Sequence, residues 1–171
     1  MGTRRKAREL AMQALFFMDQ RNDFSAESFD RFRASFAPKP EVGPFFTQLV
    51  EGVVQHRERL DALIQSASEN WSLERMSGVD RNVMRIALFE MLSCKEIPAK
   101  VSINEAVDIG KKFGTEDSGA FINGIIDTIR AAIERGDVRP FAEDPAAESA
   151  SGEKRPLVDV PAVRPLSEEI P

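Results

Sequence analysis

The spacing of apolar residues constrains the fold of this chain more than any other feature of its sequence. Between residues 4 and 135, apolar side chains recur three and four positions apart, which is the period of an α-helix. No stretch alternates apolar and polar residues for long enough to predict a strand. The clearest example is a row of isoleucines on one predicted helix face, at Ile122, Ile125, Ile126, Ile129 and Ile133. The pattern predicts an all-α domain of six or seven helices.

Capping and breaking residues predict where these helices begin and end. Ser25 can cap a short helix that carries Phe29, Phe32 and Phe36, and Pro44 suits the first position of the next helix. Ser102 and Glu105 have the spacing of a capping box, and Gly114 and Gly136 stand where helices end. We therefore expect helices over about 4–20, from Ser25 onward, 44–68, from Gly78 toward Pro98, 102–114 and 118–136. We expect Gly114 to be left-handed, and Trp71 and Leu73 to fill a connecting turn. The buried side of the third helix should consist of Phe45, Leu49, Val53, Leu60, Leu63 and Ile64.

The helix after Ser77–Gly78 is apolar around most of its circumference. Only a narrow polar strip, formed by Arg81, Asn82 and Arg85, interrupts the apolar surface. A helix of this kind is usually surrounded by others, so we expect it at the centre of the bundle.

Composition excludes several classes of function. A single cysteine, Cys94, cannot form an internal disulfide, and together with one histidine, His56, it cannot build a zinc site of the Cys/His type. Most Ser-His and Cys-His catalytic arrangements lose their base unless His56 supplies it, and we expect His56 at the surface. No phosphate-binding glycine loop, metalloprotease motif or calcium loop is present. The sequence thus predicts a non-enzyme without cofactor or metal.

Two further features concern the ends of the chain. No apolar run approaches the ~18 residues of a membrane span, and no apolar leader follows the basic start, so we expect a soluble cytoplasmic protein. Residues 140–171 hold six of the ten prolines and carry a net charge of −4, leaving −1 for residues 1–139. We expect a folded domain over 1–139 and a disordered acidic tail over 140–171, which is either plainly solvated or binds a partner through residues 157–163.

Two groups of residues suit a nucleic acid. The first is a basic cluster at the start of the first helix, which we expect to display its charges opposite the buried face of Leu10, Ala14, Phe17 and Met18. The second combines cations, hydroxyls and an aromatic ring around a turn, as single-stranded RNA requires. Glu116 and Asp117 are interpreted as acids favoured by the helix N-terminus, and Gly124 in mid-helix suggests close packing or a ligand backbone. The groups are Arg4, Arg5, Lys6 and Arg8, and Lys111, Lys112, Thr115, Ser118, Phe121 and Asn123.

Three segments carry a resemblance to a known family. RRKARELAMQALF at 4–16, VDRNVMRIALFEM at 79–91 and VSINEAVDIGKKFGTEDSGAFINGIID at 101–127 resemble the NusB family of bacterial transcription antitermination factors, and the resemblance spans about residues 3–138. It implies an all-helical fold of two small packed bundles without enzyme activity. It also implies binding to the boxA element of nascent ribosomal RNA together with NusE, a small-subunit ribosomal protein, so that RNA polymerase reads through terminators.

The resemblance also implies roles for individual residues. Gln13 joins the basic start as an RNA-binding residue, and Asp117 joins the second group, where its carboxylate would bond a base or orient its neighbours. Phe16, Asp80 and Arg85 match the side that faces NusE, although Phe16 stands where the family pattern leads us to expect a tyrosine. The resemblance leaves open whether the free protein is a monomer or a homodimer.

Two other interpretations remain at this point. The chain could be a helical adaptor that binds only proteins, with its basic start on an acidic partner. It could also resemble the NusB-like domain of some RNA cytosine methyltransferases, but residues 140–171 are too few for a methyl-donor domain. Because the body carries a charge near −1, we expect modest RNA binding alone and tighter binding beside a basic partner.

Overall fold

A computed structural model of the chain describes residues 2–141 and contains only helices within that range. The all-α prediction and the predicted number of helices are therefore confirmed. None of the described helices is long and apolar enough to span a membrane. The elements are α1 (Thr3–Gln20), α2 (Ala26–Ser35), α3 (Gly43–Ala67), the 3-10 turn η1 (Leu73–Arg75), α4 (Gly78–Ser93), α5 (Ala99–Phe113) and α6 (Ser118–Glu134).

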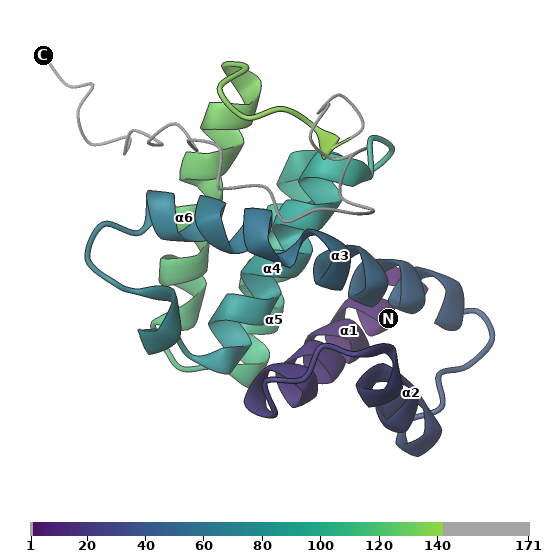
Figure 1. Cartoon of the computed structure of the whole chain (residues 1–171). Coiled ribbons are helices and arrows are strands. Elements are labelled where there is room, and N and C mark those ends of the chain that lie inside the picture. Colours follow the sequence, from purple (N-terminus) through teal and green to yellow (C-terminus); the bar gives the residue numbers. More distant parts are fainter. Residues whose placement is uncertain (1, 142–171) are drawn as a thin grey trace, which may run out of the picture.

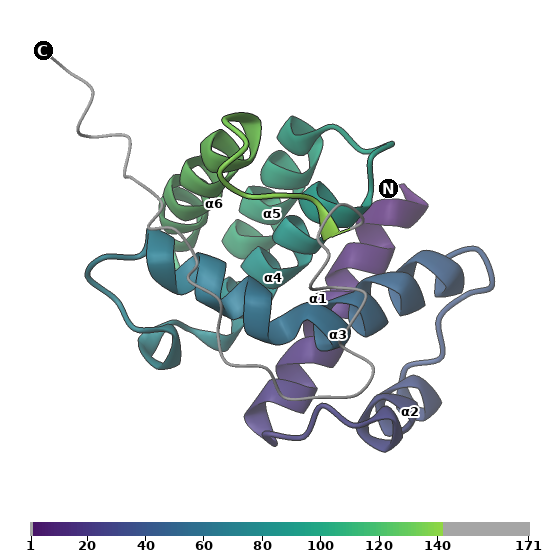
Figure 2. The same ribbon diagram turned by 45° about the horizontal axis from the view of Figure 1, so that its top comes forward.

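The helices are arranged around α4. Helices α4, α5 and α6 lie side by side, α3 runs across α1 and α4, and α2 packs at the far end of α1 (Figures 1 and 2). Helix α4 contacts α1, α3, α5 and α6, which confirms its predicted central position. The two small bundles that the resemblance implies share one continuous core.

Large apolar side chains from four of the helices meet in that core. Each fully buried Leu, Ile, Phe or Met contributes on the order of 1.5–3 kcal/mol relative to an exposed one. Gly52 makes room for the ring of Phe89 on α4, because a Cβ at this position would lie 2.1 Å from that ring. The largest fully buried residues include Leu15 and Met18 of α1, Phe46 and Leu49 of α3, Met84 and Leu88 of α4, and Ile122 and Ile126 of α6.

The start of α5 differs from the prediction. The helix begins at Ala99, directly after Pro98, so Ser102 is not its cap. Ser102 is buried inside the helix and its hydroxyl donates to Glu90 at 3.2 Å, while Glu105 bonds Arg5 of α1 instead of the Ser102 amide. The capping-box prediction is wrong because tertiary partners occupy both side chains.

Smaller details of the prediction also change. Gly114 ends α5 with φ −99°, so it is not left-handed; a Cβ there would instead lie 2.3 Å from the Ser118 hydroxyl. Phe46 is buried in place of Phe45, and Trp71 is 53% exposed and fills no turn. The predicted Ser25 cap is confirmed, since its hydroxyl accepts from the Ser28 amide.

His56 is not a plain surface residue. Its backbone (φ −106°, ψ 15°) interrupts the helical geometry of α3, and its ring stacks on Phe141 with centroids 3.9 Å apart. Burial and the nearby Arg59 charge lower the pKa of His56. Phe141 is itself buried, so the folded part extends two residues past the predicted boundary at residue 139, and the rest of the predicted tail lies outside the described residues.

Candidate nucleic-acid interface

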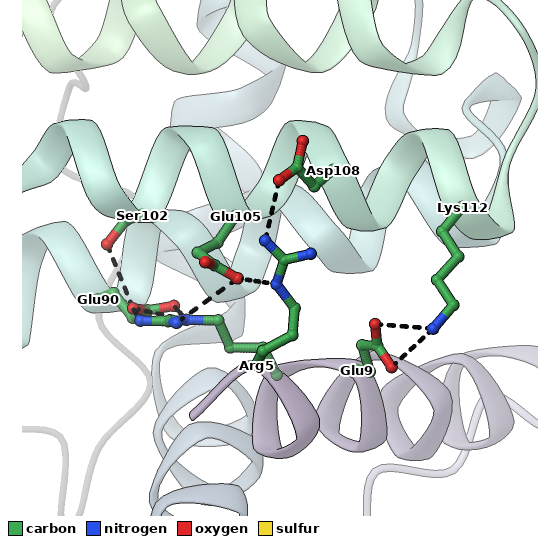
Figure 3. A network of polar contacts seen from close by, with 8 residues as sticks. Arg5, Glu9, Glu90, Ser102, Glu105, Asp108 and Lys112 are labelled. Carbon is green, nitrogen blue, oxygen red and sulfur yellow. Dashed lines mark hydrogen bonds and ion pairs between the residues drawn. The ribbon is translucent and has the colours of Figure 1, made fainter. Parts of the chain in front are cut away.

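Complementary charged side chains bridge the first half of α1 and helix α5. Arg5 donates from Nε to Glu105 and from Nη2 to Asp108 at 2.9 Å. One helical turn further along, Lys112 of α5 donates to both carboxylate oxygens of Glu9, at 3.1 and 3.2 Å (Figure 3). We call these five residues the α1–α5 seam. Its hydrogen bonds raise the pKa of Arg5, which stays cationic.

Arg8 lies beneath the seam and is only 4% exposed. Its guanidinium donates three hydrogen bonds to Glu90 of α4, from Nε at 3.1 and 2.9 Å and from Nη2 at 2.7 Å. The expectation that the basic cluster is displayed is therefore wrong for Arg8. Met12 and Leu15 follow four and seven positions later and are also buried, so Arg8 belongs to a second apolar row of α1.

Four cations of the predicted groups remain exposed. Arg4 and Lys6 project from α1, and Lys111 and Lys112 from the last turn of α5, where the helix dipole favours positive charge. The stem of Lys111 lies across Gly119, because a Cβ added there would be 2.7 Å from its Cε. Gly119 thus lets α5 bring this lysine onto the first turn of α6.

The turn between α5 and α6 presents some of its predicted groups and hides others. Ser118 is buried, and its hydroxyl accepts from the Thr115 amide at 2.9 Å, so it shapes the turn instead of facing solvent. Asp117 and Asn123 are exposed, and Phe121 is half-buried against the core.

Gly124, on the same part of α6, has an open surface. A Cβ added at Gly124 would meet nothing within 4 Å, so the chain itself does not require a glycine at this position. Of the two explanations given by the sequence, close packing is wrong. Close approach of a ligand backbone stays a prediction.

The three residues predicted to face a protein partner also include both exposed and buried side chains. Phe16 is 38% exposed and its ring lies on Gly78, where a Cβ would be 2.7 Å from it. Arg85 is only 3% exposed, and Asp80 is also buried, with its Oδ1 lacking a hydrogen-bond partner among residues 2–141. Of the three, Phe16 alone offers a large surface to a partner.

Arg85 belongs to a buried network that the sequence showed only as a polar strip on α4. It donates to both oxygens of Asp61 on α3, at 2.6 and 2.9 Å, and to Asp19 on α1 at 3.2 Å. Arg81 and Asn82 also bond Asp19, at 2.8 and 3.0 Å. Burial alone would raise the pKa of Asp19, but these hydrogen bonds and positive charges hold it below its ordinary value. Nothing local in the sequence marked Asp19 or Asp61 as the partners.

Comparison with known proteins identifies the family of this chain. A model described as the NusB family matches residues 5–131. The chain belongs to the NusB family. The transcription antitermination protein NusB of Desulfatibacillum aliphaticivorans is 52% identical over 129 residues, which cover 75% of this chain and 90% of that protein. The protein of the same name from Myxococcus xanthus is 44% identical over 139 residues, covering 79% and 99%.

Solved structures of the family share the fold. The structure of T. maritima NusB superposes with a TM-score of 0.67 at 35% identity, covering 79% of this chain and 97% of that one. A crystal structure of antitermination factors NusB and NusE in complex with double-stranded RNA gives a TM-score of 0.68 at 27% identity, covering 77% and 98%.

Proposed function

We propose that this chain is a transcription antitermination factor that binds boxA-type RNA of nascent ribosomal transcripts together with NusE and promotes read-through by RNA polymerase. The observation that carries the proposal is the convergence of exposed cations from α1 and α5, which the Lys112–Glu9 ion pair holds side by side. Its relatives bear the antitermination name, and one solved relative is a NusB bound to NusE and RNA. Such a factor works in the cytoplasm, where bacterial transcripts are made.

The proposed RNA surface has two kinds of members. Arg4, Lys6, Lys111 and Lys112 bind phosphates, because they are exposed cations. At the start of α6, Phe121 offers a partly exposed ring for stacking, and Asn123 and Asp117 offer hydrogen bonds to base edges.

Other predicted members support this surface from behind. Arg8 pins α1 to α4 through Glu90, and Ser118 fixes the α5–α6 turn through the Thr115 amide. Arg5 combines support of the surface with partial access to RNA, since it is half-buried and bonded to Glu105 and Asp108. The proposal assigns no catalytic role to these residues.

The proposed NusE surface centres on Phe16, which can pack against an apolar group of the partner. Phe16 and Asp19 both belong to α1, and Arg85 of α4 bonds Asp19. Arg85 and the buried Asp80 therefore set the position of the Phe16 surface from behind. A folded body with a net charge near −1 gains from a basic partner when it binds RNA.

The experiment that tests the proposal is a titration of labelled boxA RNA and a scrambled RNA of equal length, with and without NusE, at two salt concentrations. We expect preference for boxA that NusE strengthens, and affinity that falls with salt because phosphate contacts release counterions. Equal and weak binding of both RNAs, unimproved by NusE, would leave a helical adaptor that binds proteins alone.

A further inference from the structure

A groove runs beside the basic half of α1 and shares Lys6 with the proposed RNA surface, while its other wall lies outside that surface. It has a volume of about 320 Å³ and is bounded by α1 and by the segment that joins α2 to α3. Its lining residues are Lys6, Glu9, Leu10 and Gln13 of α1, and Pro38, Lys39 and Val42 of the connecting segment.

The α1 side of the groove follows from helical geometry. Lys6, Glu9, Leu10 and Gln13 are spaced by three, one and three positions, so they form one row along the helix. Glu9 already bonds Lys112 of α5, which joins the groove to the α1–α5 seam and offsets its negative charge.

The opposite wall is held in place by its backbone. The Lys39 carbonyl accepts from the amides of Val42 and Gly43, at 2.9 and 3.1 Å, which forms a turn just before α3. Pro38 lies against the same turn, 3.9 Å from where a Gly43 Cβ would be. The groove is therefore present before any ligand binds.

The lining combines three kinds of group. Leu10, Pro38 and Val42 give it apolar surface, and the Gln13 amide has no hydrogen-bond partner among residues 2–141. Lys6 and Lys39 are exposed at its edges, and neither forms an ion pair within the described part of the chain.

We propose that this groove is a nucleotide subsite, which takes one unstacked base of the RNA and so extends the RNA path from the α1–α5 seam to the α2–α3 segment. The inference rests on the proposed function. An apolar floor accepts the face of a base, a free amide with both a donor and acceptor can bond a base edge, and two cations suit the flanking phosphates. The volume falls at the lower end of small-ligand sites, which span about 300–1,000 Å³, and so suits a nucleoside.

The test uses Gln13→Ala and Lys39→Ala in the full chain, with Gln55→Ala on the exposed side of α3 and Arg135→Ala beyond the end of α6 as matched controls. Binding of boxA RNA, of boxA RNA with single-base changes and of scrambled RNA is measured with NusE present. We expect Gln13→Ala to weaken boxA binding by about tenfold and to remove discrimination at one base position, as loss of a base contact does. Lys39→Ala should weaken all RNAs alike and lower the salt slope by about 0.7. Neither control should change binding.

A second measurement locates the contact directly. RNA that carries a photoreactive 4-thiouridine at successive positions is crosslinked to the wild-type protein, and the crosslinked peptides are mapped by mass spectrometry. We expect one RNA position to crosslink within residues 38–42, the groove wall that lies outside the proposed RNA surface.

The outcomes separate this inference from the proposed function. If the wild-type protein does not prefer boxA, the proposed function fails and the subsite with it. If it prefers boxA while Gln13→Ala and Lys39→Ala bind like the controls and no crosslink falls in the groove, only the subsite is overturned. If both variants weaken NusE binding and leave RNA binding unchanged, the groove holds a protein segment and the nucleotide assignment is wrong.

Discussion

Two arginine clusters of this molecule look alike in the sequence and serve different ends. On α4, Arg81 and Arg85 are surrounded by Asp19 and Asp61 and face the interior. At the start of α1, Arg8 is buried in the same way and Arg5 is half-buried against α5, while Arg4 and Lys6 remain exposed. The difference shows that burial against a counter-charge from another helix commits a cation to the fold, whereas an exposed cation such as Lys112 remains available to a ligand even when it is paired.

The largest expected loss of stability concerns Arg8, the member of the α1 cluster that is buried against a counter-charge. Arg8→Ala or Glu90→Ala should lower the free energy of unfolding by about 3–5 kcal/mol, because each leaves a buried charge without its partner. Urea denaturation measures this. The double variant Arg8→Met with Glu90→Leu should recover much of the loss, since it removes both charges together.

That double variant also sharpens the comparison. If Arg8 is structural, the refolded double variant binds boxA RNA as the wild type does. If the double variant is stable but the salt slope of its RNA binding falls as that of Arg4→Ala does, Arg8 belongs among the RNA-binding residues. Burial would then not separate structural arginines from RNA-binding ones.

The α4 cluster should give the next largest effect. Arg85→Ala leaves Asp19 and Asp61 without a shared cation, and because both carboxylates are partly exposed, we expect a loss of about 2 kcal/mol in the free energy of unfolding. Arg33→Ala is the matched control, since it breaks an exposed pair with Asp30 and should cost less than about 0.5 kcal/mol. Equal losses in a denaturation experiment would contradict the buried role of the network.

Acid should act on the same network. The pKa of Asp19 is lower in the folded protein than its ordinary value, so its ionised form stabilises the fold above the unfolded pKa of about 3.9, and this contribution disappears as the pH falls through the folded pKa. Asp19→Asn should therefore be less stable than the wild type near neutral pH, and the difference should narrow as the pH falls below about 4. A difference that is constant over this range would show that the charge of Asp19 is irrelevant.

The exposed members of the α1 cluster should change stability least. Arg4→Ala and Lys6→Ala should each shift the free energy of unfolding by less than about 0.5 kcal/mol, as surface substitutions do. In RNA titrations each should lower the salt slope by about 0.7, the amount expected for one phosphate contact on a single strand. Unchanged slopes for both would remove α1 from the RNA surface.

The helices could be predicted from the sequence because their signals are local. Apolar spacing gave the all-α class and the central position of α4, and Ser25 and Ser77 marked helix starts that the structure confirms. Each of these features depends on residues within a few positions of one another.

The partners of charged residues could not be predicted in this way. Arg8 and Glu90 are 82 positions apart, and Ser102 and Glu105 gave a local capping signal that their contacts with other helices override. The site was therefore predicted as a set of residue types, whereas the division into exposed and supporting members required the fold.

The stack of Phe141 on His56 has a consequence for any shortened form of this protein. The proline-rich segment begins at Pro140, yet the ring of the next residue, Phe141, contacts His56 and Arg59 of α3 and lies near Phe89 of α4. A chain that stops at residue 139 would lose this aromatic cover and leave Phe89 more open to water, so an apparent effect of removing the acidic segment would include damage to the core. A chain that stops after Phe141 keeps that cover and isolates the contribution of the segment itself.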